Sequence, residues 1–149
     1  MATANAATTF LENRLLSFIF KNNAASFTTP GDGIYVGLAT AVSNFNNSTG
    51  ETDEPTITEA TFGAYARQRV VASAWTLTSD TTEAQTIKNT ANIEFPASTG
   101  TSNTITHVFI ADASSSGNIL FVGALDASKA IQSGDIFRIN ATNLTIELK

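Results

Sequence analysis

The chain has 149 residues, of which 14 % are charged, with a formal net charge of −5 at pH 7 and no cysteine. Its length suffices for one domain with its own hydrophobic core, and the lack of cysteine excludes disulfides, thiol catalysis and cysteine-ligated metal sites. The few charges, only 8 of them basic, predict a surface of hydroxyl, amide and small apolar groups that suits protein contacts, and they argue against a nucleic-acid partner, which requires a basic face.

Residues 1–8 are small and polar and predict a flexible N-terminal arm. They do not resemble a secretory signal peptide, because no basic region precedes an uninterrupted apolar run. No stretch of the chain approaches the roughly 20 apolar residues of a membrane span. We therefore expect synthesis in the cytoplasm of the cell and no membrane partner.

Residues 9–23 have the pattern of an amphipathic helix, with Thr9 as its N-cap and Glu12 completing a capping box. The apolar side chains cover an arc of about 200°, wider than the stripe of roughly 100° that burial against one surface requires. Two interpretations are open. Either the helix lies in a groove of its own domain, or one flank packs on the domain while the other contacts a neighbouring subunit.

Short apolar runs bounded by turn residues follow the turn sequence of residues 30–33. They predict strands at Ile34–Ala39, Ala64–Val71, Ala74–Thr78, Ala91–Phe95, Ile105–Asp112, Ile119–Leu125, Asp135–Ile139 and Leu144–Leu148. This pattern is typical of a mainly β protein with a single antiparallel β-sandwich, jelly-roll-like or Ig-like, preceded by one α-helix. We divide the chain into an N-terminal arm and helix, residues 1–23, and a β-sandwich domain, residues 24–149.

A loop of about twenty polar residues is predicted at residues 42–61, and loops of that length are usually functional or become ordered in an assembly. Its acidic residues are Glu51, Asp53, Glu54 and Glu59. Carboxylates are ligands for hard cations, but their spacing matches no EF-hand loop. A solvated acidic loop is the preferred interpretation, and we predict no metal site.

His107 is the one imidazole available as a catalytic base. On an alternating strand it shares a face with Ile105, Phe109 and Ala111, whereas Asp112 points to the other face, roughly 16 Å away along the strand. The two residues therefore cannot form a dyad there. The chain contains no nucleophile elbow, phosphate-binding loop, dinucleotide fingerprint or H-E-x-x-H motif, so we predict no catalytic residue, cofactor or small-molecule substrate.

Five sequence motifs follow one another along residues 33–149: GIYVGLATA, YARQRV, ANIEFPAST, ITHVFIADASSSGNILFVGAL and IQSGDIFRINATNLTIEL. In this order they resemble a group of small structural proteins of tailed bacteriophages, whose members include capsid decoration, cement, tail-fibre-like and minor tail proteins. The resemblance implies a β-sandwich without catalytic residues. Tyr65 and Arg67 would anchor a strand, Gly123 would let neighbouring chains approach closely, and Gly134 with Asp135 would form a turn.

Two functional hypotheses follow from this resemblance. The preferred one is a capsid decoration (cement) protein, a homotrimer that binds the major capsid protein on the outer surface of the virion and stabilises the head. The alternative is a tail-fibre or minor tail protein that contacts host glycan or protein. The expected subunit or capsid interface consists of Phe10, Leu11, Leu15, Leu16, Phe18, Ile19, Phe20 and Phe45.

Overall fold

The computed structural model describes residues 2–4, 6–22, 33–44, 54–78 and 85–148. This part of the chain is mainly β, with the α-helix α1 (Thr9–Lys21) and a short 3₁₀ turn, η2 (Ala72–Ala74). The strands are β1 (Ala2–Ala4), β2 (Ala6–Ala7), β3 (Gly33–Ser43), β4 (Thr56–Glu59), β5 (Gln68–Val71), β6 (Trp75–Thr78), β7 (Gln85–Asn89), β8 (Ile93–Glu94), β9 (Asn103–Ala111), β10 (Ile119–Ile131), β11 (Arg138–Ile139) and β12 (Leu144–Leu148). The predicted fold class is confirmed.

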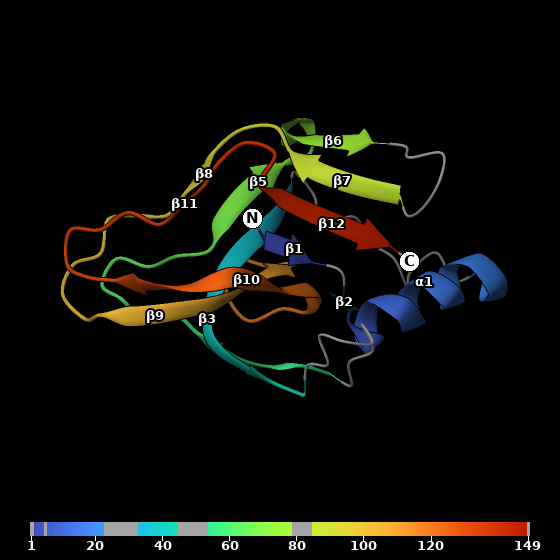
Figure 1. Ribbon diagram of the computed structural model, residues 1–149. Coiled ribbons are helices and arrows are strands. Elements are labelled where there is room, and N and C mark those ends of the chain that lie inside the picture. The colour runs from blue at the N-terminus through green and yellow to red at the C-terminus, as the bar shows by residue number, and fades with distance from the viewer. Residues whose placement is uncertain (1, 5, 23–32, 45–53, 79–84, 149) are drawn as a thin grey trace.

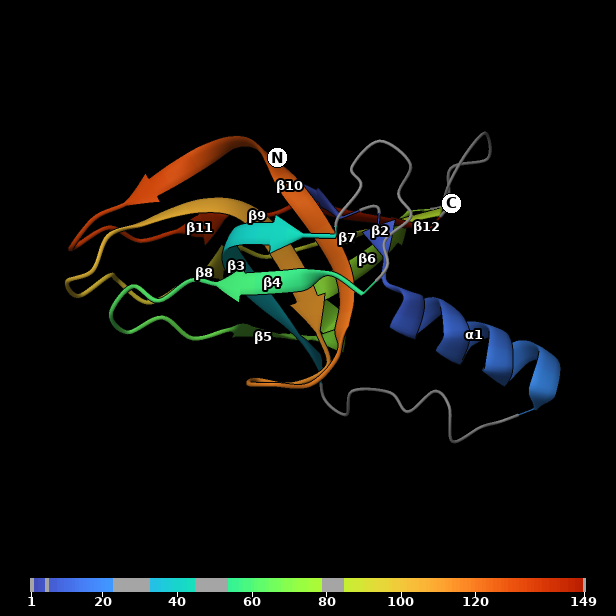
Figure 2. The ribbon, with the colours of Figure 1, turned by 90° about the horizontal axis from the view of Figure 1, so that it is seen from below.

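The strands form two packed layers, as Figures 1 and 2 show. One layer contains β3, β9 and β10, with β4 and β5 paired to β3, and the other contains β12, β7 and β6. Side chains from both layers meet in one buried cluster, in which Val36 and Leu38 of β3 join Leu144 and Ile146 of β12. A second small cluster around Phe109 covers the opposite face of the β3–β9–β10 layer. These central strands are apolar on both faces because both faces are covered.

The β9–β10 hairpin is antiparallel, but its register shifts where Ala124 pairs with His107 and Lys129 pairs with Ile105. At this bulge β10 contains more residues than β9, which bends and twists the strand. The predicted alternation holds for Phe109 and Ala111, which share one cluster. It fails for Ile105, which joins the main core with Val108 instead of sharing a face with Phe109.

The N-terminal segment is not the predicted flexible arm. Ala2–Ala4 forms β1, which pairs in parallel with β12 and in antiparallel fashion with β10, and Ala6–Ala7 forms β2 on β10. The backbone of small residues forms sheet hydrogen bonds like that of any other residue, and small side chains need little space. A polar, alanine-rich segment can therefore be a strand where two neighbouring strands offer unpaired backbone groups. The domain boundary at residue 23 stays a prediction, because residues 23–32 lie outside the described part.

Besides β1 and β2, two further strands occur where none was predicted. Thr56–Glu59 forms β4 on β3 within the predicted 42–61 loop, and Gln85–Asn89 forms β7 between β12 and β6. Both carry alternating polar residues, which weakens their apolar signal. Other predicted strands are shorter than expected. Residues 62–67 form a turn, in which the Tyr65 N–H donates to the Phe62 carbonyl, before β5 begins at Gln68.

The turn at residues 132–135 also shortens a predicted strand. The Asp135 N–H donates to the Gln132 carbonyl and the Gln132 N–H donates to the Asp135 carboxylate, while Gly134 has a φ of 91°. Glycine adopts this left-handed conformation without a steric penalty. The predicted turn is confirmed, and β11 begins only at Arg138.

Candidate functional site

The helix α1 begins at a buried threonine. Thr8, and not the predicted Thr9, is the N-cap, and its side-chain oxygen accepts a hydrogen bond from the Leu11 N–H at 3.3 Å. The Thr8 hydroxyl also donates to the Ile119 carbonyl on β10 at 2.6 Å. This residue therefore fixes both the start of the helix and its attachment to the sheet. The helix ends at Lys21, and the C-cap residue Asn22, in a left-handed conformation, donates its N–H to the Ser17 carbonyl and so closes the last turn.

Exposure rises along the helix from its first turn to its last. Leu11 is 9 % exposed, Leu16 55 %, Ile19 57 % and Phe20 78 %. Figures 1 and 2 show the reason: the helix is attached to the body at its N-terminal end and projects away from it. The prediction that an apolar flank of the helix lies away from its own domain is therefore favoured over complete burial.

The predicted interface residues fall into three groups. Leu11 is buried, Phe10 and Leu15 are half-buried, and Leu16, Phe18, Ile19 and Phe20 are exposed. The Arg14 guanidinium lies 5.1 Å from the centre of the Phe10 ring, so part of this ring is covered from its own helix. Phe45 lies outside the described residues. No partner chain tests the interface, and its role stays a prediction.

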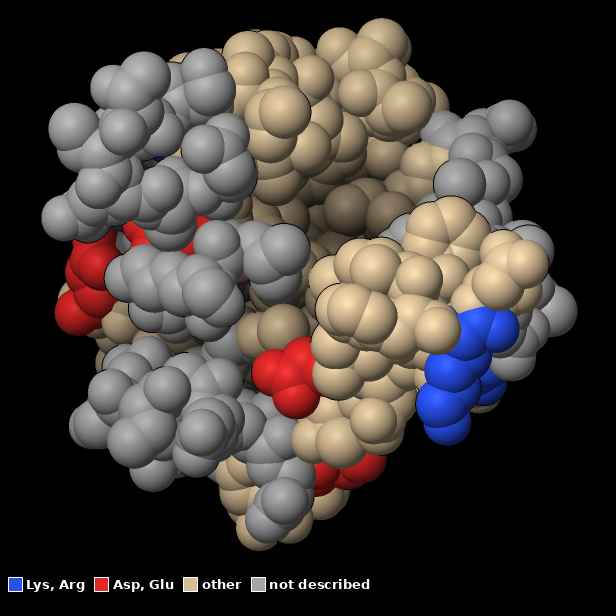
Figure 3. Space-filling model, turned by 90° about the vertical axis from the view of Figure 1, so that its right-hand side faces the viewer, with Lys and Arg blue, Asp and Glu red and all other residues tan. Residues whose placement is uncertain are grey.

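The face of the molecule from which the helix projects carries few charges among its described residues (Figure 3). Lys21 lies in the last helical turn and Glu12 in the first, which matches the polarity of the helix dipole. Between them Asn13 and Arg14 are exposed on one side of the helix, and Leu16, Phe18, Ile19 and Phe20 form an exposed apolar flank. A surface of this kind loses little hydration free energy when a protein partner covers it.

The chemically richest cluster joins Glu59 of β4 to Tyr65 and Arg67. Arg67 binds the Glu59 carboxylate through two nitrogens, with N–O distances of 2.8 and 2.9 Å, and the Tyr65 hydroxyl donates to the same carboxylate at 2.8 Å. The Arg67 side chain is only 7 % exposed. The Leu38 N–H donates to the Tyr65 oxygen at 2.9 Å, which connects the cluster to β3.

The arginine also closes the β9–β10 turn. It donates to the carbonyls of Ala113 and Ser116 at 2.9 and 2.8 Å. Its guanidinium lies 5.0 Å from the centre of the buried Phe109 ring, a cation–π contact. The predicted anchoring role of Tyr65 and Arg67 is confirmed, although they lie in the segment before β5. Glu59 was predicted as a residue of a solvated loop, and this is wrong because it is the carboxylate of this ion pair.

The charges in this cluster shift one another's pKa values. Burial would raise the pKa of Glu59, but the hydrogen bonds from Arg67 and Tyr65, together with the Arg67 charge, lower it overall. Burial raises the pKa of Tyr65, and the bond to the Glu59 carboxylate adds to this rise. The hydrogen bond to Glu59 raises the pKa of Arg67. All three groups are held in the state that forms the ion pair, which indicates a structural role.

His107 and Asp112, which were considered above as a catalytic dyad, both have structural roles. The Asp112 carboxylate accepts hydrogen bonds from the backbone N–H and the side-chain amide of Asn118, both at 2.7 Å, and so closes the hairpin turn. The Nδ1 atom of His107 lies 2.8 Å from the Thr106 hydroxyl, and burial lowers the pKa of this histidine. The two residues form no dyad, and His107 is a packed strand residue.

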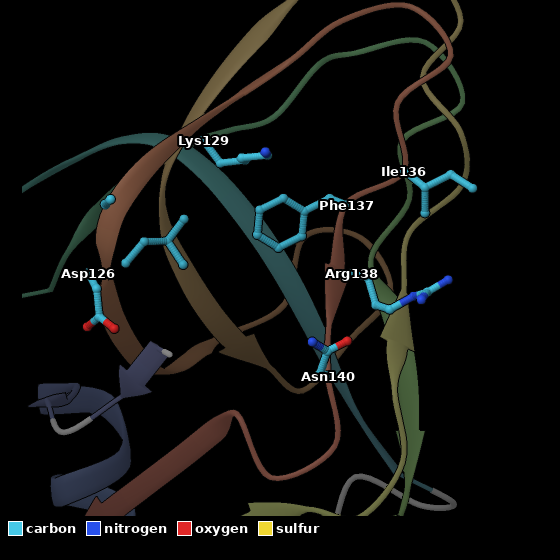
Figure 4. A pocket seen from close by; sticks show the side chains of 8 residues that line it. Asp126, Lys129, Ile136, Phe137, Arg138 and Asn140 are labelled. Carbon is cyan, nitrogen blue, oxygen red and sulfur yellow. The ribbon is translucent and has the colours of Figure 1, made fainter.

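An open cleft of about 580 Å³ lies beside the bulge of β10. Figure 4 shows Asp126 and Lys129 of β10 on one side, and Ile136, Arg138 and Asn140 of the chain around β11 on the other. The Arg138 guanidinium pairs with Glu94 at 2.8 Å, and both side chains are largely exposed. The cleft brings together no acid–base pair and no nucleophile that sequence reasoning had singled out.

Among the described residues, no group of three or more histidines, aspartates and glutamates is placed to hold a metal ion. Of the acidic residues that suggested a cation site, Glu51 and Asp53 lie outside the described part, Glu54 is exposed, and Glu59 is bound to Arg67. No helix in the described part is both long and apolar enough to cross a membrane.

The comparison with protein families gives one match that covers nearly the whole chain. The model of the family described as Podophage GP4 fiber I protein gp80 matches residues 6–147. No curated protein matches the chain significantly. The matched range contains the helix α1 and nearly all of the sandwich, so the match covers the body of the fold and the exposed helix together.

Proposed function

The chain belongs to the podophage GP4 fiber I protein gp80 family, a family of tailed-phage virion structural proteins, and we propose that it is a component of the fibre of the virion. The observation that carries this proposal is the family match over residues 6–147. The family description favours the fibre hypothesis over the capsid decoration hypothesis that sequence reasoning preferred. The chain acts, in this proposal, by binding other proteins and not by catalysis.

The structure supports a role in assembly. A rigid sandwich with a helix that projects from it presents a defined apolar contact surface, formed by Leu16, Ile19 and Phe20. The polar clusters support the same role. Glu59, Arg67 and Asp112 are each occupied by hydrogen bonds that hold strands and turns together. Their side chains stabilise the sandwich and are not free to act on a substrate.

Capsid decoration is the second candidate, because the exposed apolar helix also suits docking on a lattice of the major capsid protein. In that case the protein would be a homotrimer on the capsid surface, and its loss would weaken the head. In the fibre case its loss would instead impair attachment to the host cell. The two candidates therefore differ in copy number, position and phenotype.

Quantitative mass spectrometry of purified virions distinguishes them, with the major capsid protein as the internal standard. We expect a small fraction of the copy number of the major capsid protein, and we expect antibody-labelled electron micrographs to place the protein at the tail. A copy number comparable to that of the major capsid protein, with label spread over the head, would overturn the fibre proposal in favour of decoration.

A phage with a stop codon in this gene supplies the functional readout. Particles produced without the protein should adsorb poorly to host cells but withstand heat and osmotic shock as wild-type particles do. Complementation from a plasmid is the control, because it must restore adsorption. Normal adsorption combined with fragile heads would contradict the proposal.

A further inference from the structure

The cleft beside the bulge of β10 lies between the edges of two sheets. On the side away from β9, β10 pairs with β2 at Phe121 and Val122 and with β1 at Leu125. Beyond Leu125, no strand of the described part pairs with this side of residues 126–130. Across the cleft, β11 pairs with β8 alone among the described strands. The ten-stranded and the two-stranded sheet therefore end on opposite sides of the cleft (Figure 4).

The segment of β10 that borders the cleft is open on both faces. All side chains of residues 126–130 are exposed, although a strand of a sandwich normally buries alternate side chains. An edge strand with uncovered faces is a template for pairing with another strand. The bulge and Lys129 are features that natural edges use against indiscriminate pairing. They leave the segment selective, because a lysine disfavours a strand with a cation opposite it and favours one with an anion.

The shape and the floor of the cleft suit an extended polypeptide. Phe137 and Leu125 line it and belong to the side chains of the main core, and Ile136, at 54 % exposure, adds an apolar contact at its rim. The cleft is open, whereas sites for small molecules enclose most of the ligand surface. Phe137, the aromatic residue of the described lining, is only 8 % exposed and offers no platform on which a sugar could stack. A peptide strand can instead pair with a sheet edge through its backbone and place alternate side chains on the floor.

Cations on both sides of the cleft complement a carboxylate. The Lys129 ammonium forms no ion pair or hydrogen bond with the described part of the chain, and Figure 4 shows its side chain extending from β10 in the direction of the chain around β11. Arg138 binds Glu94 through Nη2 alone, so its other N–H donors have no acceptor among the described residues. Asp126, the acidic residue of the lining, is already engaged within the chain. An acidic side chain placed in the cleft would thus find donors on two sides.

We propose that an extended segment of another virion protein adds as a strand along residues 126–130 of β10, and that an acidic side chain of this segment binds Lys129 and Arg138. The site is separate from the apolar flank of α1, so it gives the chain a second contact surface. The inference rests on the proposed function only in that the chain binds other proteins of the virion. It holds for a position in the fibre and for one on the capsid.

Amide hydrogen exchange tests the added strand by comparing the protein in purified virions with the free protein. Mass spectrometry with fragmentation that resolves single amides gives the exchange rates. We expect those amides of residues 126–130 that do not pair with β9 to exchange about tenfold more slowly in virions, because each gains a hydrogen bond. The exposed turn at residues 114–117 is the internal reference and should exchange equally fast in both samples.

Lys129→Glu tests the charge of the partner. The reversal places a carboxylate opposite the acidic side chain of the added strand, so the amides of residues 126–130 should exchange at the rate of the free protein, or the variant should be lost from the particles. Lys129 is exposed, and denaturant titration should find the stability of this variant unchanged. The matched control is Lys88→Glu on β7, outside the lining of the cleft. It makes the same change of charge and should keep both the slow exchange and the incorporation.

Four outcomes would overturn the proposal. Equal exchange of residues 126–130 in virions and in the free protein would show that no strand is added. Equal slowing of the turn at residues 114–117 would indicate general shielding. Slow exchange that persists in Lys129→Glu virions would exclude an acidic partner at this lysine. Slowing that requires added host-cell polysaccharide would assign the cleft to a glycan. The fibre proposal can fail while this one succeeds, because copy number and labelling measure the position in the virion separately.

Discussion

The sandwich body and the N-terminal segment are held in place in different ways. The body around β3 and β9 is locked by specific side chains, above all by the Glu59–Arg67 ion pair and the Tyr65 hydroxyl. The N-terminal segment is held by backbone pairing, by one buried threonine and by Leu11. A region of the first kind depends on the identity of its side chains, whereas backbone pairing makes few demands on them.

Within the sandwich body, two arginines that form ion pairs differ in how deeply they are buried. Arg67 is 7 % exposed and also binds two carbonyls, while Arg138 is 49 % exposed and binds only the Glu94 carboxylate among the described residues. The same type of ion pair should therefore contribute very differently at the two positions, since breaking a buried pair leaves an uncompensated charge.

The largest effect is expected for Arg67→Ala. Removing the guanidinium takes the countercharge from the partly buried Glu59 carboxylate, which keeps only the hydrogen bond from the Tyr65 hydroxyl described above, and it leaves two carbonyls without their side-chain donor. It also removes the cation–π contact with Phe109. The free energy of unfolding should fall by about 3 kcal/mol, measured by denaturant titration of the purified protein. The control, Arg138→Ala, should cost less than about 1 kcal/mol because its pair is exposed. Equal losses for both variants would show that the cluster is not the lock of the body.

The next largest effect separates two leucines of one helix. Leu11→Ala removes a side chain that is 9 % exposed and should lower the free energy of unfolding by about 2 kcal/mol. Leu16→Ala, at 55 % exposure, should change it by less than about 0.5 kcal/mol yet weaken association between copies. Denaturant titration measures the first effect and size-exclusion chromatography the second. If Leu16→Ala destabilises the fold as much as Leu11→Ala, the helix is part of its own body along its whole length.

The strands that sequence reasoning located are those with a continuous apolar signal. β9 and β10 were predicted because each contains an apolar run, Val108–Ala111 in β9 and Ile119–Leu125 in β10, whose residues are buried or half-buried. β1, β4 and β7 were missed for the opposite reason. They are short, and alanine, threonine and other polar residues fill them, so their conformation depends on partner strands that the local sequence does not reveal.

The candidate site was predicted unevenly for related reasons. The apolar arc of about 200° in α1 left open whether the helix lies in a groove of its own domain or exposes one flank, and the exposure of Leu16, Ile19 and Phe20 favours the second interpretation. The ion pair was seen only in part, since Arg67 was noted and Glu59 was assigned to a solvated loop. Which carboxylate faces an arginine depends on the register of β4 against β3, and residue spacing along the chain does not determine it. The position of β1 between β10 and β12 is likewise a property of strand order and not of local sequence.

The smallest expected effect is a difference in how the stability loss depends on pH. A substitution in the N-terminal segment and one in the charged cluster of the sandwich body should differ in this dependence. Residues 2–8 contain no titratable side chain, so the stability lost in Thr8→Ala should be the same at every pH. The loss in Glu59→Gln should be about 1.5 kcal/mol near pH 7 and should shrink below about pH 4.5. The reason is that ionised Glu59, whose pKa is lowered in the folded protein, stabilises the fold above its unfolded pKa and ceases to do so as pH falls through the folded value.

His107, whose pKa is also lowered, destabilises the fold as it is protonated at acid pH. This contribution is the same in all variants, so it cancels when their free energies of unfolding are compared. Denaturant titrations of the wild-type protein and both variants between pH 3 and 7 measure these differences. A pH-dependent loss for Thr8→Ala would show that the N-terminal segment is coupled to a charged group, and would remove the distinction between the two regions.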